Sequence, residues 1–194
     1  ITQTDLLLHE AADLQKSLAA KERLVENYLS DPQKIADLKN YSKDEKLAVS
    51  FIETNRSQGI NLLVFKNKQL DFWSSAKVNP NIERLKEGRS FRFFANGWYD
   101  VFKKTVDNYT FVFFITVKTQ FSIENKFLQN KIAPELFPRN SLEIATFTDK
   151  SVTEIFSIKK EFLFPVKLSD EYSRNIYTNI QIWLWVVGLF SICL

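Results

Sequence analysis

The last part of the chain, residues 176–194, is a largely apolar segment without a single Asp, Glu, Lys, Arg or His. At the roughly 1.5 Å rise of an α-helix it reaches about 28 Å, close to the roughly 30 Å of hydrocarbon in a bilayer. Tyr177, Trp183 and Trp185 are amphipathic aromatics of the kind found at membrane surfaces. We therefore expect the start of a C-terminal transmembrane helix. The alternative is a buried core helix, which the lack of a polar stripe disfavours.

Composition limits what the rest of the chain can be. With 194 residues, 45% hydrophobic and 25% charged, the chain is long enough for a domain with a real core. A net charge of +3 that is spread along the chain argues against nucleic acid as a partner. The only cysteine, Cys193, lies in the apolar segment, so we expect no disulfide and no thiol chemistry upstream.

The N-terminal segment, residues 4–30, has an apolar seam with alternating four- and three-residue spacing: Leu7, Ala11, Leu14, Leu18, Lys21, Val25 and Tyr28. A period of 3.5 residues is typical of a helix that packs against a partner helix, which predicts a homodimer through this helix. The alternative is an amphipathic helix that lies on its own domain. The seam leaves both interpretations open.

Two shorter helices are expected after this one. Asp31-Pro32 ends the long helix and is suited to open the next, with Asp as cap and Pro in the first turn. Ser42 and Glu45 have the spacing of a capping box, which predicts a third helix that ends before Gly59. Residues 1–58 therefore form a helical segment.

From Gly59 onward the pattern changes to strands. Residues 60–65 and 69–73 flank Asn67-Lys68, and residues 91–95 and 98–105 flank Asn96-Gly97, so each pair predicts a hairpin. After a turn at Asp107-Asn108, residues 109–119 have apolar side chains without alternation. That pattern is typical of a central strand covered on both faces. Residues 142–147, 154–158 and 162–166 are further candidate strands.

The usual catalytic constellations are missing. His9 is the only histidine and lies on the N-terminal helix, so neither a Ser-His-Asp nor a Cys-His site can form within one copy. The four glycines are scattered, without a phosphate-binding loop, and no acidic spacing resembles a calcium loop. We expect no catalytic residues, no metal and no cofactor in this segment.

Aromatic residues offer the one hypothesis for a site. The chain contains 18 Phe, 6 Tyr and 4 Trp, and most of the Phe are expected in the core. Several Trp and Tyr side chains instead fall at strand ends and hairpin turns beside polar groups, as in small-molecule pockets. The predicted ligand-binding residues, on one face of the sheet, are Trp73, Arg92, Trp98, Tyr99, Asp100 and Tyr109.

Residues 59–130, and above all Asn96-Gly97-Trp98-Tyr99 and the run from Val117 to Leu128, give the chain a family resemblance. It resembles the extracytoplasmic sensor region of membrane-bound bacterial sensor histidine kinases, of the PAS-like or Cache-like kind. The resemblance implies a periplasmic domain between two membrane helices, a small-molecule ligand, and a cytoplasmic kinase beyond this segment.

We therefore expect an α+β fold: N-terminal helices packed on a PAS/Cache-like antiparallel sheet of five or six strands. The expected parts are the helical segment 1–58, the sensor sheet 59–175 and the transmembrane helix 176–194. Expected alternatives are the sensor of a chemoreceptor or cyclase, and a membrane-anchored binding protein without signalling output. A tethered hydrolase is disfavoured by the missing His and Cys chemistry.

Overall fold

The computed structural model describes residues 2–76, 78, 82–121, 123, 130–146, 148–170 and 172. The predicted transmembrane segment, 176–194, lies outside the described residues. Within the described part of the chain, no helix is both long and apolar enough to cross a membrane.

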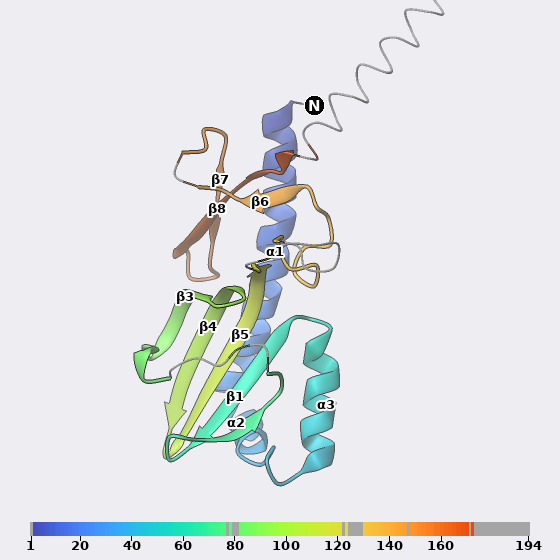
Figure 1. Cartoon of the computed structure of the whole chain (residues 1–194). Helices are drawn as coiled ribbons and strands as arrows, with labels where there is room; N and C mark the ends of the chain where they lie inside the picture. Colours follow the sequence, from blue (N-terminus) through green and yellow to red (C-terminus); the bar gives the residue numbers. More distant parts are fainter. Residues whose placement is uncertain are drawn as a thin grey trace, which may run out of the picture.

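The long N-terminal helix α1, Gln3–Ser30, extends along most of the length of the described structure (Figure 1). It begins with a capping box, in which the Thr2 hydroxyl accepts from the Asp5 N–H and the Asp5 carboxylate accepts from the Thr2 N–H. Leu14, Leu18 and Val25 in its seam are fully buried against the chain's own sheets. Of the two interpretations of the seam, the structure therefore supports the helix that lies on its own domain.

Two short helices follow, and one of their predicted caps is wrong. Helix α2, Pro32–Leu38, begins as expected, with the Asp31 side chain accepting from the backbone of its first turn. Helix α3, Glu45–Arg56, is capped by Asp44, whose Oδ1 accepts from the Leu47 N–H at 3.0 Å. The Ser42 hydroxyl instead donates to Asp71, because the chain is still in a turn at residue 42.

The larger sheet is antiparallel and has five strands in the order β2-β1-β5-β4-β3. Its strands are β1 (Ile60–Lys66), β2 (Gln69–Trp73), β3 (Gly88–Phe94), β4 (Gly97–Val106) and β5 (Tyr109–Thr119). A short 3₁₀ turn, η1 (Ile82–Arg84), precedes β3. The predicted turns at Asn67-Lys68 and Asp107-Asn108 and the central position of residues 109–119 are confirmed. The second hairpin is confirmed too, but its turn lies one residue earlier than predicted, at Ala95-Asn96, because Gly97 already pairs with Phe94. Residues 67, 68 and 107 adopt the positive φ that tight turns require.

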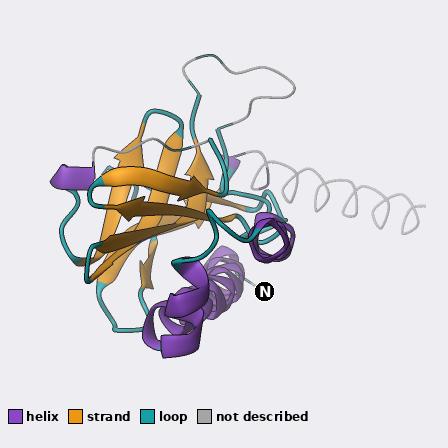
Figure 2. Cartoon of the chain, turned by 90° about the horizontal axis from the view of Figure 1, so that it is seen from below, coloured by secondary structure: helices purple, strands orange, loops and turns teal. Residues whose placement is uncertain are grey.

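The three remaining strands do not join the larger sheet. They form a second sheet in the order β6-β8-β7, made of β6 (Leu142–Ile144), β7 (Thr153–Phe156) and β8 (Phe162–Leu168). Helix α1 contacts β5 of the first sheet and all three strands of the second. Figure 1 shows the two sheets at successive levels along α1, and Figure 2 shows the helices beside the strands from below.

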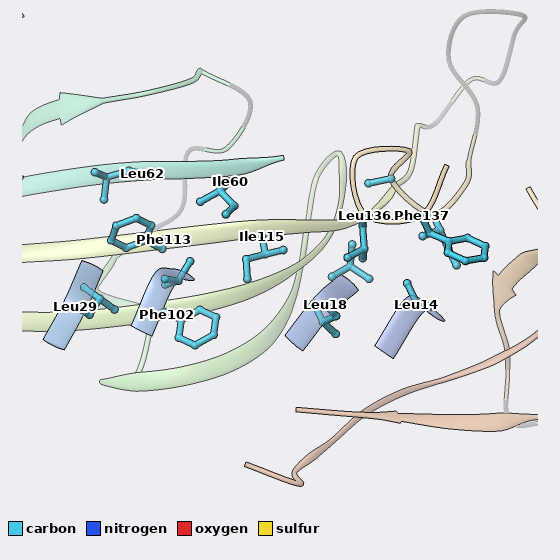
Figure 3. Packing of buried hydrophobic residues seen from close by; sticks show 14 of the residues in the cluster. Leu14, Leu18, Leu29, Ile60, Leu62, Phe102, Phe113, Ile115, Leu136 and Phe137 are labelled. Atoms are coloured by element: carbon cyan, nitrogen blue, oxygen red, sulfur yellow. The ribbon is translucent and has the colours of Figure 1, made fainter. Parts of the chain in front are cut away.

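The core has two parts on opposite faces of the larger sheet. The main cluster joins α1 to both sheets and contains Leu14, Leu18, Phe102, Phe113, Ile115 and Leu136, as Figure 3 shows. The second cluster, on the other face, contains Leu63, Val78, Leu85, Tyr99 and Phe114. The α+β class and the long N-terminal helix are thereby confirmed.

Candidate functional site

The six predicted ligand-binding residues do not share one face of the sheet. Cross-strand pairing and the two core clusters place Trp98, Asp100 and Tyr109 on the face toward α1. Trp73, Arg92 and Tyr99 belong to the opposite face. Side chains alternate along a strand, so the adjacent Tyr99 and Asp100 must point to opposite faces.

The aromatic members of this set mostly serve packing. Tyr99 is 1% exposed, donates to Asn96 Oδ1 at 3.0 Å, and its pKa is raised by burial. Trp98 stacks on Phe91 with ring centroids 5.5 Å apart and donates its indole N–H to Gln120 at 3.2 Å. Trp73, on edge strand β2, is 55% exposed. These contacts account for Tyr99 and Trp98 without a ligand, whereas Trp73 is largely open to solvent.

Two further members, Tyr109 and Arg92, differ in how well their polar groups are satisfied. The ring of Tyr109 lies beneath the ammonium groups of Lys39 and Lys66, at 5.6 and 5.5 Å from its centroid. Arg92 lies on β3 at the sheet edge, and its buried Nε has no hydrogen-bond partner among the described residues. Arg92 is therefore the less satisfied of the two.

Asp100 belongs to a buried ion cluster with Arg89 and Glu22, which we call the junction cluster. Arg89 donates two hydrogen bonds to the Asp100 carboxylate, from Nε at 2.7 Å and from Nη2 at 2.5 Å. The same Nη2 also bonds to the Glu22 carboxylate. Both acidic side chains are 0% exposed and the arginine side chain is 8% exposed. Such a cluster is costly to bury unless each member is paired.

The junction cluster ties four segments together. Glu22 comes from α1, Arg89 from β3 and Asp100 from β4. The second carboxylate oxygen of Glu22 accepts from the backbone N–H of Ile158, in the turn between β7 and β8, at 2.7 Å. The side chain of Glu22 on α1 is thus bonded both to the larger sheet, through Arg89, and to the smaller sheet, through the turn at Ile158.

The junction cluster has two acidic groups for one basic group, because the guanidinium of Arg89 pairs with the carboxyl groups of both Glu22 and Asp100. Burial raises the pKa of Glu22 to about 7, despite the opposing backbone hydrogen bond and the charge of Arg89. Burial also raises the pKa of Asp100, which the bonds from Arg89 partly oppose. Glu22 is thus a carboxyl group that changes its protonation near neutral pH.

A groove of about 460 Å³ opens beside the junction cluster, which we call the junction groove. Its volume lies within the usual range for a small-molecule site. It lies between the C-terminal end of α1, the start of β3 and the middle of β4. Its lining residues are Glu26, Leu29, Ser30, Glu87, Gly88, Arg89, Phe102, Lys103, Lys104 and Lys159.

A second polar contact fixes α1 about three turns closer to its N-terminus. Glu10 is 3% exposed and accepts from the Ser141 hydroxyl and from Arg139 Nη1, the latter at 3.1 Å. Arg139 also bonds to Asp13. This contact joins α1 to the segment that leads into β6.

Sequence reasoning placed Asp100 in a site but missed Glu22 and Arg89. A signal for Glu22 was present, because it lies four residues after Leu18 and three before Val25, within the apolar stripe of α1. An acidic residue at such a position has to find a buried partner. The partner itself was not predictable, since Arg89 lies 67 residues away in the chain.

Within the described residues, no group of three or more His, Cys, Asp or Glu side chains is placed to hold a metal ion. Comparisons of the chain with protein-family models, with curated proteins and with solved structures give no match.

Proposed function

We propose that this chain is the extracytoplasmic ligand-sensing region of a membrane-bound sensor histidine kinase. In this proposal the sheets face the periplasm, and membrane helices on both sides connect them to a cytoplasmic kinase. The sheet order β2-β1-β5-β4-β3 with a long N-terminal helix on one face agrees with the PAS-like or Cache-like resemblance of residues 59–130.

The observation that carries the proposal is the position of the two ends of the folded unit. A groove of about 610 Å³ is lined both by Gln3 and Thr4, in the first turn of α1, and by Leu168 and Asp170 at the end of β8. Figure 1 shows the start of α1 and the end of β8 at the same end of the molecule. A domain whose two ends lie together is suited to insertion between two membrane helices, with the rest of its body projecting away.

The junction cluster supports the signalling part of the proposal. A sensor domain signals when its ligand favours one packing of the connecting helices over another. Glu22 holds α1 to both sheets, and Glu10 holds α1 to the segment before β6, so a change in the sheets can be passed to α1 as a displacement. The first turn of α1 would carry this displacement to the membrane.

A chimeric receptor tests the proposal. Residues 1–194 replace the sensor region of a bacterial histidine kinase that controls a reporter gene. We expect reporter output to change when Arg89→Gln breaks the junction cluster, while Arg84→Gln, an exposed arginine of η1, leaves output unchanged at equal protein level. A membrane-impermeant maleimide should label Val49→Cys in intact cells, because Val49 is 43% exposed. Output that ignores the junction cluster, or a residue 49 that stays unlabelled until lysis, would contradict the proposal.

A further inference from the structure

The junction cluster has room for one proton in its balance of charge. When all three members are ionised, Glu22 and Asp100 carry two negative charges and Arg89 carries one positive charge. Both carboxyl groups are 0% exposed, so water does not screen the excess negative charge. Two carboxyl groups that share a site resist ionising together. The cluster is therefore suited to hold one proton.

The two carboxyl groups are close enough to share that proton. Glu22 Oε1 and Asp100 Oδ2 both bond to the same nitrogen atom, Nη2 of Arg89. Burial raises the pKa of Glu22, and the charge of Asp100 adds to this effect. Burial raises the pKa of Asp100 as well, but the bonds from Arg89 and a hydrogen bond from Glu22 oppose it. Glu22 is thus the group that carries the proton, and Asp100 accepts from it.

The charged groups of α1 and of the turn after β7 leave this balance in place. Lys159 pairs with Glu26 at 3.4 Å, one turn further along α1 than Glu22. Lys21 donates to the backbone carbonyl of Gln58, on another side of the helix. Glu161, in the same turn as Lys159, adds to burial in raising the pKa of Asp100.

The charged groups on β4 and before β3 do not change it either. Lys103 lies three residues after Asp100, so its side chain is on the opposite face of the sheet. Lys104 is on the same face as Asp100 but about 14 Å further along the strand, where it donates to the Leu29 carbonyl. Glu87 accepts from Thr105. Within the described residues, Arg89 is the one cation that bonds to Glu22.

Ionisation of Glu22 is coupled to the packing of α1. With α1 closed on the sheets, burial raises the pKa of Glu22 from 4.5 to about 7, whereas a packing that exposes Glu22 to water would restore the ordinary value. A rise in pH therefore favours the open packing, by linkage. Between pH 5 and pH 8 the equilibrium should shift on the order of a hundredfold. The junction groove beside Arg89 gives solvent a route to the cluster.

We infer that the junction cluster is a pH switch, in which a proton shared by Glu22 and Asp100 keeps α1 closed on the two sheets. As the pH rises, the O–H bond of Glu22 breaks and the proton passes to water in the junction groove. The buried negative charge that remains favours separation of α1 from Arg89 and from the turn at Ile158. The switch concerns the folded unit. Its use as a signal rests on the proposed function, for which it names external pH as the stimulus.

NMR of the purified full chain in detergent micelles tests the protonation step. The protein is labelled with ¹³C at its side-chain carboxyl groups, and the Glu22 resonance is assigned through the backbone and followed from pH 5 to pH 9. We expect it to titrate with a midpoint near pH 7. A midpoint below pH 5 would overturn the inference. The measurement uses the unmodified protein, so the answer does not depend on the folding of a variant.

Hydrogen exchange tests whether the proton controls the contact of α1. The Ile158 amide donates to Glu22, so its exchange, corrected for the intrinsic effect of pH, reports opening of this contact. Between pH 5 and pH 8 opening should increase on the order of a hundredfold, and it should stay constant in Glu22→Gln. At pH 8 Ile158 should also exchange faster than Phe113 of β5, because α1 opens without unfolding of the sheet. Equal rates at these two amides, or the same pH dependence in Glu22→Gln, would overturn the inference.

The chimeric receptor tests the use of the switch. Reporter output should change between external pH 6 and pH 8, and Glu22→Gln should hold it at the pH 6 level. The matched control is His9→Gln, because histidine is the side chain that most often changes charge near pH 7. His9 lies on the same helix, about 20 Å from Glu22, with a side chain that is 70% exposed. His9→Gln should keep the full response, and loss of the response in this variant would count against the switch.

The experiments separate the switch from the proposed function. A receptor that responds to Arg89→Gln but not to pH would overturn the switch and leave the sensor proposal standing. A receptor that responds to neither, while Glu22 titrates near pH 7 and Ile158 opens in the purified chain, would refute the sensor proposal and leave the switch standing.

Discussion

Glu22 is a carboxyl group whose environment in the native state differs strongly from that in the unfolded chain. Its pKa rises from an ordinary 4.5 to about 7 on folding, because burial disfavours the charged carboxylate more than Arg89 favours it. Between these two pKa values the native state holds a proton that the unfolded state has released. The resulting stabilisation is therefore fully present below about pH 4.5 and is lost as the pH rises through 7.

The first prediction follows from this difference. The free energy of unfolding should fall by up to about 3 kcal/mol between pH 5 and pH 8, and Glu22→Gln should remove most of that fall. Urea unfolding at four pH values, read by circular dichroism, measures it. Glu53→Gln, which changes an exposed residue of α3, serves as the control and should keep the full pH dependence. Identical pH profiles for the unmodified protein and Glu22→Gln would contradict the assignment.

Gly97 gives a second prediction at the residue scale. A Cβ at this position would lie 2.1 Å from the carbonyl oxygen of Lys118 on β5, so the glycine is required by the close approach of two strands. Gly97→Ala should destabilise the protein by more than about 3 kcal/mol. Gly88→Ala, with open space but a φ of +89°, should cost only about 1 kcal/mol. Chemical denaturation of both variants measures the contrast, and a Gly97→Ala as stable as Gly88→Ala would contradict it.

At the scale of elements, α1 not only buries its apolar face but also forms hydrogen bonds with the backbone of a strand. The side-chain amide of Gln15 pairs with the backbone of Phe156 in the way that a neighbouring strand would. Its Oε1 accepts from the Phe156 N–H at 2.8 Å, and its Nε2 donates to the Phe156 carbonyl. Strand β7 is an edge of the smaller sheet, so α1 covers groups that would otherwise be open to pairing.

The third prediction concerns this contact. Gln15→Ala should destabilise the protein by about 1–2 kcal/mol and speed hydrogen exchange at the Phe156 amide, because two hydrogen bonds are lost. Gln15→Glu, which keeps the acceptor but loses the donor, should protect the Phe156 amide better than Gln15→Ala. Exchange monitored by NMR distinguishes the three proteins. Equal exchange in all of them would show that Gln15 does not cover the strand.

The elements also show which features the sequence predicts. Local signals were sufficient for α1, for the Asn67-Lys68 hairpin, for the second hairpin to within one residue, and for strand β5, because each depends on neighbours in the chain. The position of β6, β7 and β8 in a separate sheet was not predicted, since strand patterns do not specify which sheet a strand joins. The junction cluster was missed for the same reason: it is a long-range pairing between Glu22 and Arg89.

At the scale of the whole molecule, α1 and the two sheets share one core. Phe164 of β8 stacks on Phe91 of β3, with ring centroids 5.1 Å apart, and is only 2% exposed. The main hydrophobic cluster includes residues of both sheets together with those of α1. Two sheets that bury one common cluster cannot expose their inner faces independently. Under the proposed function, a signal carried by a change in packing would therefore involve both sheets, because both share the core cluster with α1.

The last prediction is that both sheets unfold together. Phe164→Ala should destabilise the protein by about 3–5 kcal/mol, through the cavity it leaves and the lost ring contact. Hydrogen exchange detected by mass spectrometry should then show the same loss of protection in β8, where the change lies, and in β5 of the other sheet. Leu70→Ala, at a 49% exposed position on edge strand β2, is a control that should leave both unchanged. Loss of protection confined to β6, β7 and β8 would mean that the smaller sheet unfolds on its own, and a displacement of α1 could then arise there without the larger sheet.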